Sequence, residues 1–256
     1  KTVLLPIVSL LGNETITPAA ERVGIVFPIH LDFVPSHIRP FFKSIDLSSS
    51  EYVFVVVTNG GMANPGISRV WIDKVLREKG GRLNYLFDVV MPMNTPTGLV
   101  PTIIKGSKKW ANNVSEQNVE RIEKEAQKKL EEIARAVEAR KSNSGTEPSR
   151  LDRAKELFMS RLTESSSKIV GFFSDTTCTS CGTCERVCPS GRVTIVDGRP
   201  EWQDGVECYH CYACFNFCPE QAILVKNYLE KNGRYVHPEV SVEDIAGQKQ
   251  KLIDKV

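Results

Sequence analysis

Three apolar stretches punctuate the amino-terminal part of the chain: RVGIVFPIH (22–30), YVFVVVTNGG (52–61) and LNYLFDVVMPMN (83–94). Each is a continuous run followed by turn or polar residues, which is typical of strands buried on both faces of a parallel sheet. The segments between them repeat apolar residues at helical spacing, namely Ile38, Phe41, Phe42 and Ile45, then Val70, Ile72, Val75 and Leu76. This alternation predicts an α/β fold with a doubly wound parallel sheet and right-handed crossovers.

A further apolar run, VLLPIVSLL, occupies residues 3–11, close behind Lys1. It predicts a short buried strand, and the alternative is the apolar stretch of a signal peptide. Both this run and the one that begins at Tyr52 are too short to span a membrane.

A long helix is predicted from Ser115, which is placed as its N-cap. Its apolar stripe consists of Val119, Ile122, Ala126, Leu130, Ile133 and Val137. Charged residues of both signs cover the remaining positions. We expect this helix to cover the sheet, and a helix dedicated to a partner protein is the alternative.

The positions of the turn and linker residues predict three parts of the chain. Residues 1–141 form the α/β domain, and SNSGTEPSR (142–150) breaks the long helix and begins a linker. The linker, residues 142–166, includes the short helix LDRAKELFMSRL. Residues 167–256 form a separate cysteine-rich domain with a carboxyl-terminal tail.

Composition limits the possible functions. The chain is 41% hydrophobic and 25% charged with a net charge of +2, which fits a soluble globular protein and gives no reason to expect nucleic acid as a partner. It has no G-x-S-x-G elbow, Walker loop or paired-carboxylate motif, so no catalytic residue is assigned. Any chemistry must therefore come from bound cofactors.

All eight cysteines lie in two copies of C-x2-C-x2-C-x3-C-P, which begin at Cys178 and Cys208. Disulfide frameworks are typical of small secreted domains, whereas a large cysteine-free region precedes these motifs. Zinc sites usually use C-x2-C pairs separated by a longer span. Three cysteines in C-x2-C-x2-C instead suit three corners of one 4Fe–4S cubane. The spacing therefore favours two iron–sulfur clusters. We also expect the protein to be cytoplasmic.

From about residue 168 to 228 the chain resembles the two-cluster (2x 4Fe–4S) bacterial-type ferredoxins. In that pattern the fourth cysteine of each motif binds the other cluster. The implied ligands are Cys178, Cys181, Cys184 and Cys218 for cluster 1, and Cys208, Cys211, Cys214 and Cys188 for cluster 2. Between the motifs, RVTIVDGRPEW predicts a hairpin that turns at Asp197-Gly198, and AILVKNYL supplies a further strand.

Aromatic residues surround the second motif more densely than the first: Tyr209, Tyr212, Phe215 and Phe217. We expect them to shield a cubane from water, and an electron conduit or docking surface is the alternative. From Lys168 to Tyr228 there are five basic and seven acidic side chains. Bound clusters would add further negative charge, which predicts an anionic face for docking a redox partner protein.

Two loops follow the first two predicted strands, FPIHLDFVP (27–35) and TNGGMANPG (58–66). With the MP-x-N segment at Met91, they resemble a flavodoxin-like domain fused to a two-cluster ferredoxin, a family common in anaerobic bacteria and archaea. The resemblance implies a bound FMN. Its ring would be lined by Phe27, Pro28, Ile29 and His30 on one side and by Thr58, Asn59, Gly60, Gly61 and Met62 on the other, with Asn94 nearby.

Two departures from that family bear on the flavin. A flavodoxin binds the FMN phosphate with a loop after its first strand, and no such loop precedes the stretch TVLLPI, which looks like the second strand. We therefore expect the first strand and the phosphate loop to lie upstream of Lys1, and FMN to bind only when they are present. In addition, Thr95 stands where the family often has an aromatic residue.

The resulting hypothesis is an electron-transfer protein that passes electrons between two 4Fe–4S clusters, an FMN and a redox partner. Two alternatives stay open. The flavodoxin-like part could be a flavin-free docking scaffold, or the chain could be a reductase of a small organic substrate. A bound flavin separates the first hypothesis from the second, and turnover without a partner protein identifies the third.

Overall fold

A computed structural model describes the chain as two compact units. In the sheet unit the structure describes residues 10–30, 32–61, 63–91, 120–143, 151, 154, 157 and 158. In the cysteine unit it describes residues 2–9, 92–94, 114–119, 171–226 and 233–249. The domain boundaries expected from the sequence stay a prediction.

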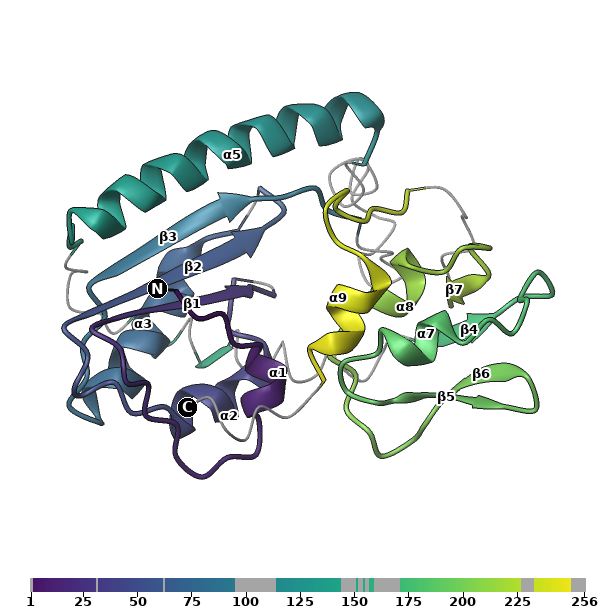
Figure 1. The fold of residues 1–256 in the computed structure, drawn as a ribbon, viewed down its shortest axis with the longest axis horizontal. Coiled ribbons are helices and arrows are strands. Elements are labelled where there is room, and N and C mark those ends of the chain that lie inside the picture. The colour runs from purple at the N-terminus through teal and green to yellow at the C-terminus, as the bar shows by residue number, and fades with distance from the viewer. Residues whose placement is uncertain are drawn as a thin grey trace. The chain divides into compact units, whose positions relative to one another are not determined.

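The sheet unit contains three parallel strands in the order β1 (Arg22–Pro28), β2 (Tyr52–Asn59) and β3 (Tyr85–Val90) (Figure 1). Ile25 pairs with Val55, and Val56 pairs with Phe87. The predicted parallel α/β sheet is therefore confirmed. A doubly wound sheet also reverses its strand order, and among these three described strands the order runs in one direction only.

Helices α2 (Arg39–Ser44) and α3 (Pro65–Arg77) cover one face of this sheet, and a short 3-10 turn, η1 (Ser36–Ile38), leads into α2. The ring of Phe27 on β1 meets that of Phe42 on α2 at 5.5 Å, and Phe42 meets Trp71 on α3 at 5.6 Å. The Asn64 side chain caps α3 by accepting a hydrogen bond from the Gly66 N–H. Both predicted crossover helices are thus present, and the rings of Phe27, Phe42 and Trp71 pack together between them and β1.

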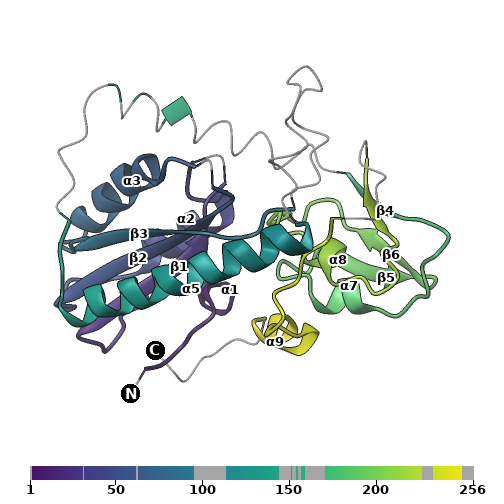
Figure 2. The ribbon, with the colours of Figure 1, turned by 90° about the horizontal axis from the view of Figure 1, so that it is seen from above.

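Helix α5 (Glu116–Glu138) covers the opposite face of the sheet from α3 (Figure 2). Its Ala126, Ile133 and Ala136 form one core cluster with Val56 and Phe87. The helix is therefore a sheet-covering helix, as the sequence favoured.

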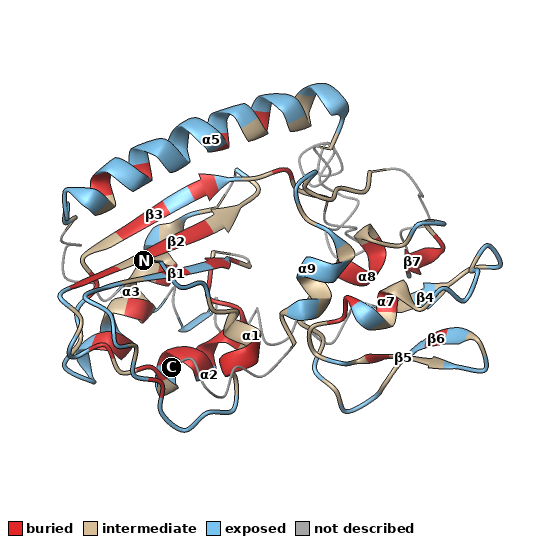
Figure 3. Ribbon diagram, viewed as in Figure 1, coloured by how far each residue is buried: buried red, intermediate tan, exposed pale blue. Residues whose placement is uncertain are grey.

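One member of the predicted stripe on α5 is wrong. Leu130 is 45% exposed, and Ala136 takes a buried place instead. Figure 3 shows α5 as a mostly exposed helix with buried patches along its length. Eight residues at about 100° each put Leu130 about 80° around the helix from Ile122, at the edge of the buried stripe.

The strand predicted near the amino terminus is also wrong. Residues 2–6 have no regular structure, and α1 (Ile7–Leu10) is a single helical turn. Pro6 has no N–H to give to a sheet, and its carbonyl accepts hydrogen bonds from the N–H and hydroxyl of Ser9 at 3.0 and 2.7 Å. Val3 and Leu4 are 61% and 91% exposed, so this apolar run is not a buried strand. Among the described helices, none is long and apolar enough to cross a membrane.

The cysteine unit contains two small antiparallel sheets. Strand β4 (Phe172–Ser174) pairs with β7 (Ile223–Val225), and β5 (Val193–Val196) pairs with β6 (Arg199–Trp202). The turn between β5 and β6 has positive φ at both Asp197 (47°) and Gly198 (74°), which is the two-residue turn that suits a hairpin. The hairpin and the strand after the second motif are therefore confirmed.

Helices α7 (Thr183–Arg186) and α8 (Ala213–Asn216) occupy the same place in the two cysteine motifs, each starting two residues after the second cysteine. The carboxyl-terminal segment of the same unit holds α9 (Val242–Gly247), which a capping box between Ser241 and Asp244 begins. Glu243 forms an ion pair with Arg186 at 2.7 Å, so α9 packs beside α7.

Candidate metal centre

The backbone winds in the same way through both cysteine motifs. Ser180 and Gly182 in the first motif have positive φ angles of 60° and 74°, and His210 and Tyr212 at the same offsets in the second have 52° and 55°. Left-handed residues turn the chain sharply and let successive N–H groups point toward one side. The repeated conformation therefore builds two loops of the same shape, each carrying three cysteines.

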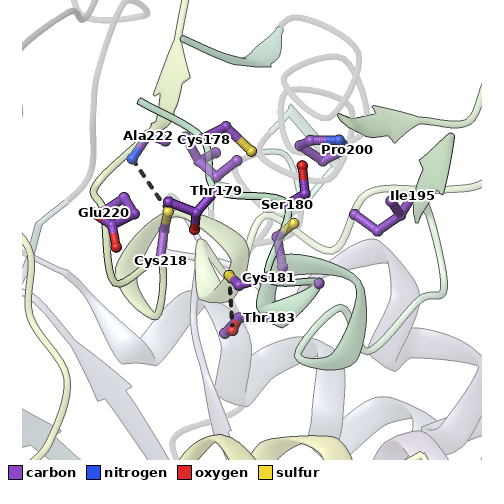
Figure 4. A pocket seen from close by; sticks show the side chains of 13 residues that line it. Cys178, Thr179, Ser180, Cys181, Thr183, Ile195, Pro200, Cys218, Glu220 and Ala222 are labelled. Atoms are coloured by element: carbon purple, nitrogen blue, oxygen red, sulfur yellow. Dashed lines mark hydrogen bonds between the residues drawn. The ribbon is translucent and has the colours of Figure 1, made fainter. Parts of the chain in front are cut away.

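The first pocket is lined by four cysteines, Cys178, Cys181, Cys184 and Cys218 (Figure 4). It encloses about 320 Å³ of space, including a part open to solvent. The Ala222 N–H donates to the Cys218 sulfur at 3.2 Å, and the Cys181 sulfur lies 3.4 Å from the Thr183 hydroxyl. The pocket is otherwise lined mainly by small residues and by Ile195 and Pro200 of the hairpin.

The second pocket is lined by the other four, Cys188, Cys208, Cys211 and Cys214, and has the same volume of about 320 Å³. Aromatic rings form part of its wall, since Phe172 stacks on Trp202 at 5.8 Å and meets Tyr212 at 5.7 Å. Tyr209 also lines this pocket, whereas Phe215 is fully buried in the core behind it. Of the four aromatic residues singled out in the sequence, Tyr209 and Tyr212 thus line the pocket and Phe215 lies behind it. Cys211 is nevertheless exposed, so shielding of a cubane by these rings stays a prediction.

Each pocket thus takes three cysteines from one motif and one from the other. The β5–β6 hairpin reaches both pockets: its Ile195–Pro200 pair lines the first, and its Val193–Trp202 pair lines the second. Because residues two apart on a strand share a face, one face of the hairpin serves both pockets.

The protonation of the thiols depends on their burial. Burial raises the pKa of Cys184 to about 11 and that of Cys214 well above its ordinary value. Hydrogen bonds from the Thr183 hydroxyl and N–H instead lower the pKa of Cys181. Without a cation beside them, the buried thiols therefore stay protonated at neutral pH, and binding a cationic centre releases their protons.

The residues expected to line a flavin lie at the carboxyl ends of β1 and β2 in the sheet unit. Phe27 and Ile29 are buried at 3% and 8% exposure, and Phe27 packs in the aromatic core. Pro28 is exposed and His30 is half-buried. Thr58, Asn59 and Gly60 are half-buried, Gly61 is exposed, and Met62 lies outside the described residues.

Asp32 joins the two loops at this rim, a role that the sequence did not reveal. Its carboxylate accepts a hydrogen bond from the Asn64 N–H at 2.7 Å, and its carbonyl accepts one from the Ser68 hydroxyl at 2.9 Å. Asn94, expected near the flavin, lies in the cysteine unit, where its side-chain amide contacts that of Asn216.

Arg192 and Trp202 are two further residues that sequence reasoning missed, and both line the second pocket. For Arg192 the sequence did contain a signal, because the two motifs differ there. An arginine lies four residues after the last cysteine of the first motif, where the second motif has Ala222.

Comparison with known proteins supports the assignment of the cysteine motifs. The model of the 4Fe–4S dicluster domain matches residues 177–223, which include every cysteine of both pockets. No curated protein and no solved structure matches the chain.

Proposed function

We propose that this protein is an electron carrier that holds two 4Fe–4S clusters, one in each cysteine-lined pocket. A dicluster domain supports iron–sulfur electron transfer in general terms, and the proposal adds the ligands and the partner. The observation that carries it is the division of eight thiols into two sets of four around separate pockets. A cubane needs one thiolate at each of its four iron corners, so both donor sets fit it.

The proposed ligands are Cys178, Cys181, Cys184 and Cys218 for cluster 1, and Cys208, Cys211, Cys214 and Cys188 for cluster 2. When bound, each cluster supplies a one-electron couple. The protein supplies orientation, exclusion of water and hydrogen bonds to sulfur, such as that from the Ala222 N–H to Cys218. Because each cubane would bridge both motifs, neither motif should hold a cluster without the other.

The test is the metal content of full-length protein purified without oxygen. About eight iron and eight acid-labile sulfide per chain are expected, four of each for every cluster. Protein that reconstitutes with zinc, or that reaches only half the iron, would contradict the assignment.

We further propose that FMN binds at the rim formed by the loops after β1 and β2. Parallel strands end at the same edge of a sheet, where such folds bind ligands. Gly60 is half-buried and Gly61 is exposed there, so this backbone lies within reach of the polar edge of a flavin ring. The Gly61 N–H donates to the Asn59 side chain at 2.7 Å, and that side chain would have to turn away for the Gly61 amide to bind the ring. The FMN would exchange electrons with the clusters and with a redox partner protein.

Flavin extraction from native-length protein tests this second step separately from the iron content. Protein with eight iron but no flavin, and no uptake of added FMN, would leave the sheet unit as a docking scaffold. Reduction of a small organic substrate by a chemical electron donor, without any partner protein, would instead indicate a reductase.

A further inference from the structure

The second pocket contains two buried hydrogen-bond donors that have no acceptor. Among the described residues, the buried side-chain nitrogens without a hydrogen-bond partner are Nε of Arg192 and Nε1 of Trp202. Both residues line the second pocket. A buried donor without an acceptor is unfavourable, so two of them beside one pocket point to an acceptor that the bound state provides.

Both donors lie in the wall of the pocket that the proposed ligands of cluster 2 line: Cys188, Cys208, Cys211 and Cys214. Trp202 also packs against the core cluster that contains Cys188 and Cys214. The indole and the guanidinium therefore share this pocket with the four thiols.

The first pocket has neither feature at the equivalent positions. Four residues after the final cysteine, Arg192 of one motif corresponds to Ala222 of the other. Two residues after that cysteine, Ser190 lines the second pocket and Glu220 lines the first. On the hairpin, the Val193–Trp202 pair faces the second pocket, and the Ile195–Pro200 pair, which has no side-chain donor, faces the first.

The two pockets thus differ in charge as well as in donors. A cation and an indole N–H line the second, whereas an acidic side chain lines the first. Glu207, next to Cys208 in the sequence, and Glu220 are both exposed, but only Glu220 lines one of the two pockets. Donors and positive charge at the sulfur atoms stabilise the more negative, reduced state of a cluster, and a carboxylate opposes it.

We infer that Arg192 and Trp202 donate hydrogen bonds to the sulfur atoms of cluster 2 and make it the electron-accepting cluster of the pair. An electron that enters at either cluster then resides mainly on cluster 2, and cluster 1 is the stronger reductant. This inference rests on the proposed binding of two clusters.

The test is a redox titration of the holoprotein followed by electron paramagnetic resonance, with the variants R192Q, R192K, W202F and E220Q. We expect two one-electron steps in the wild type. R192Q should lower the ratio of reduced cluster 2 to reduced cluster 1 about tenfold, equivalent to 59 mV for one electron. W202F keeps the stacking ring and loses the N–H. It should therefore lower this ratio about fivefold, which corresponds to the net contribution of one hydrogen bond.

The other two variants separate charge from donation and identify the steps. R192K retains the charge without the Nε–H, so its shift should be smaller than that of R192Q. E220Q should raise the reduction potential of cluster 1 and leave that of cluster 2 unchanged. One common potential for both clusters in the wild type, or R192Q and W202F holoproteins that titrate like it, would overturn the inference. Wild-type protein without eight iron would instead overturn the proposed function itself, and measuring the iron of every variant distinguishes the two failures.

Discussion

Arg234 fastens the carboxyl-terminal segment to the second cysteine motif, and its loss should release both clusters. The guanidinium donates to the carbonyls of Gln221 and Ile223 at 2.8 and 2.7 Å and also to that of Phe215. It lies 3.7 Å from the centre of the Phe215 ring. Phe215 lies between Cys214 and Cys218, which are proposed ligands of different clusters, so one substitution disturbs both.

The contacts set the expected size of the effect. Hydrogen bonds from a charged donor contribute roughly 1.5–3 kcal/mol each, and a cation–π contact contributes roughly 0.5–2 kcal/mol. Because these carbonyls are only part-buried and water can replace some of the bonds, we take about 3 kcal/mol for R234A in total. That free energy corresponds to about 150-fold in an equilibrium constant.

The assay is the loss of visible cluster absorbance at a fixed urea concentration, because cluster loss is irreversible and is best measured as a rate. R234A should bleach at least about tenfold and up to about 150-fold faster than the wild type, with both clusters lost together. R234K cannot reach three carbonyls with one ammonium, so it should recover little of the difference. R186A is the matched control, since its ion pair with Glu243 joins side chains that are 52% and 71% exposed and should change the rate less than about fivefold. Bleaching of R234A at the wild-type rate, or loss confined to one cluster, would refute this reasoning.

Three further predictions follow from the sites and the sheet. C188A should abolish the signal of cluster 2 and spare that of cluster 1, although Cys188 belongs to the first motif; electron paramagnetic resonance would count against the crossover if cluster 1 alone were lost. G61V should block FMN uptake by native-length protein, because the branched side chain fills the rim. G61A carries the same backbone strain at φ 96° and should still bind FMN, so an equal loss of FMN binding in both variants would point to strain alone. I133A should destabilise the sheet unit by about 2–4 kcal/mol in denaturant unfolding, and L130A by less than about 0.5 kcal/mol, because Ile133 is buried and Leu130 is 45% exposed; equal effects would contradict the packing of α5.

Where a structural feature depends on neighbouring residues, the sequence alone was sufficient. Asp197-Gly198 predicts its hairpin because both residues tolerate the positive φ that the turn requires. The continuous apolar run around Val55 predicts a buried parallel strand, because residues 53–57 are all apolar. The spacing of the cysteines likewise predicts a cluster-binding chemistry, since three closely spaced thiols suit three corners of one cubane.

Features that depend on residues distant in the sequence were decided only by the tertiary structure. The apolar run at Val3 reads as a strand, but no β-partner pairs with it among the described residues, and Pro6 begins a helical turn instead. The stripe on α5 passes over Ala136 and leaves Leu130 at its edge because the sheet beneath the helix determines which arc is covered. Trp202 stands apart from both motifs in the sequence, and only the hairpin brings its indole to the pocket that Arg192 also lines. The spacing of the cysteines can thus predict the cofactor, whereas the fold decides which neighbouring side chains line each pocket.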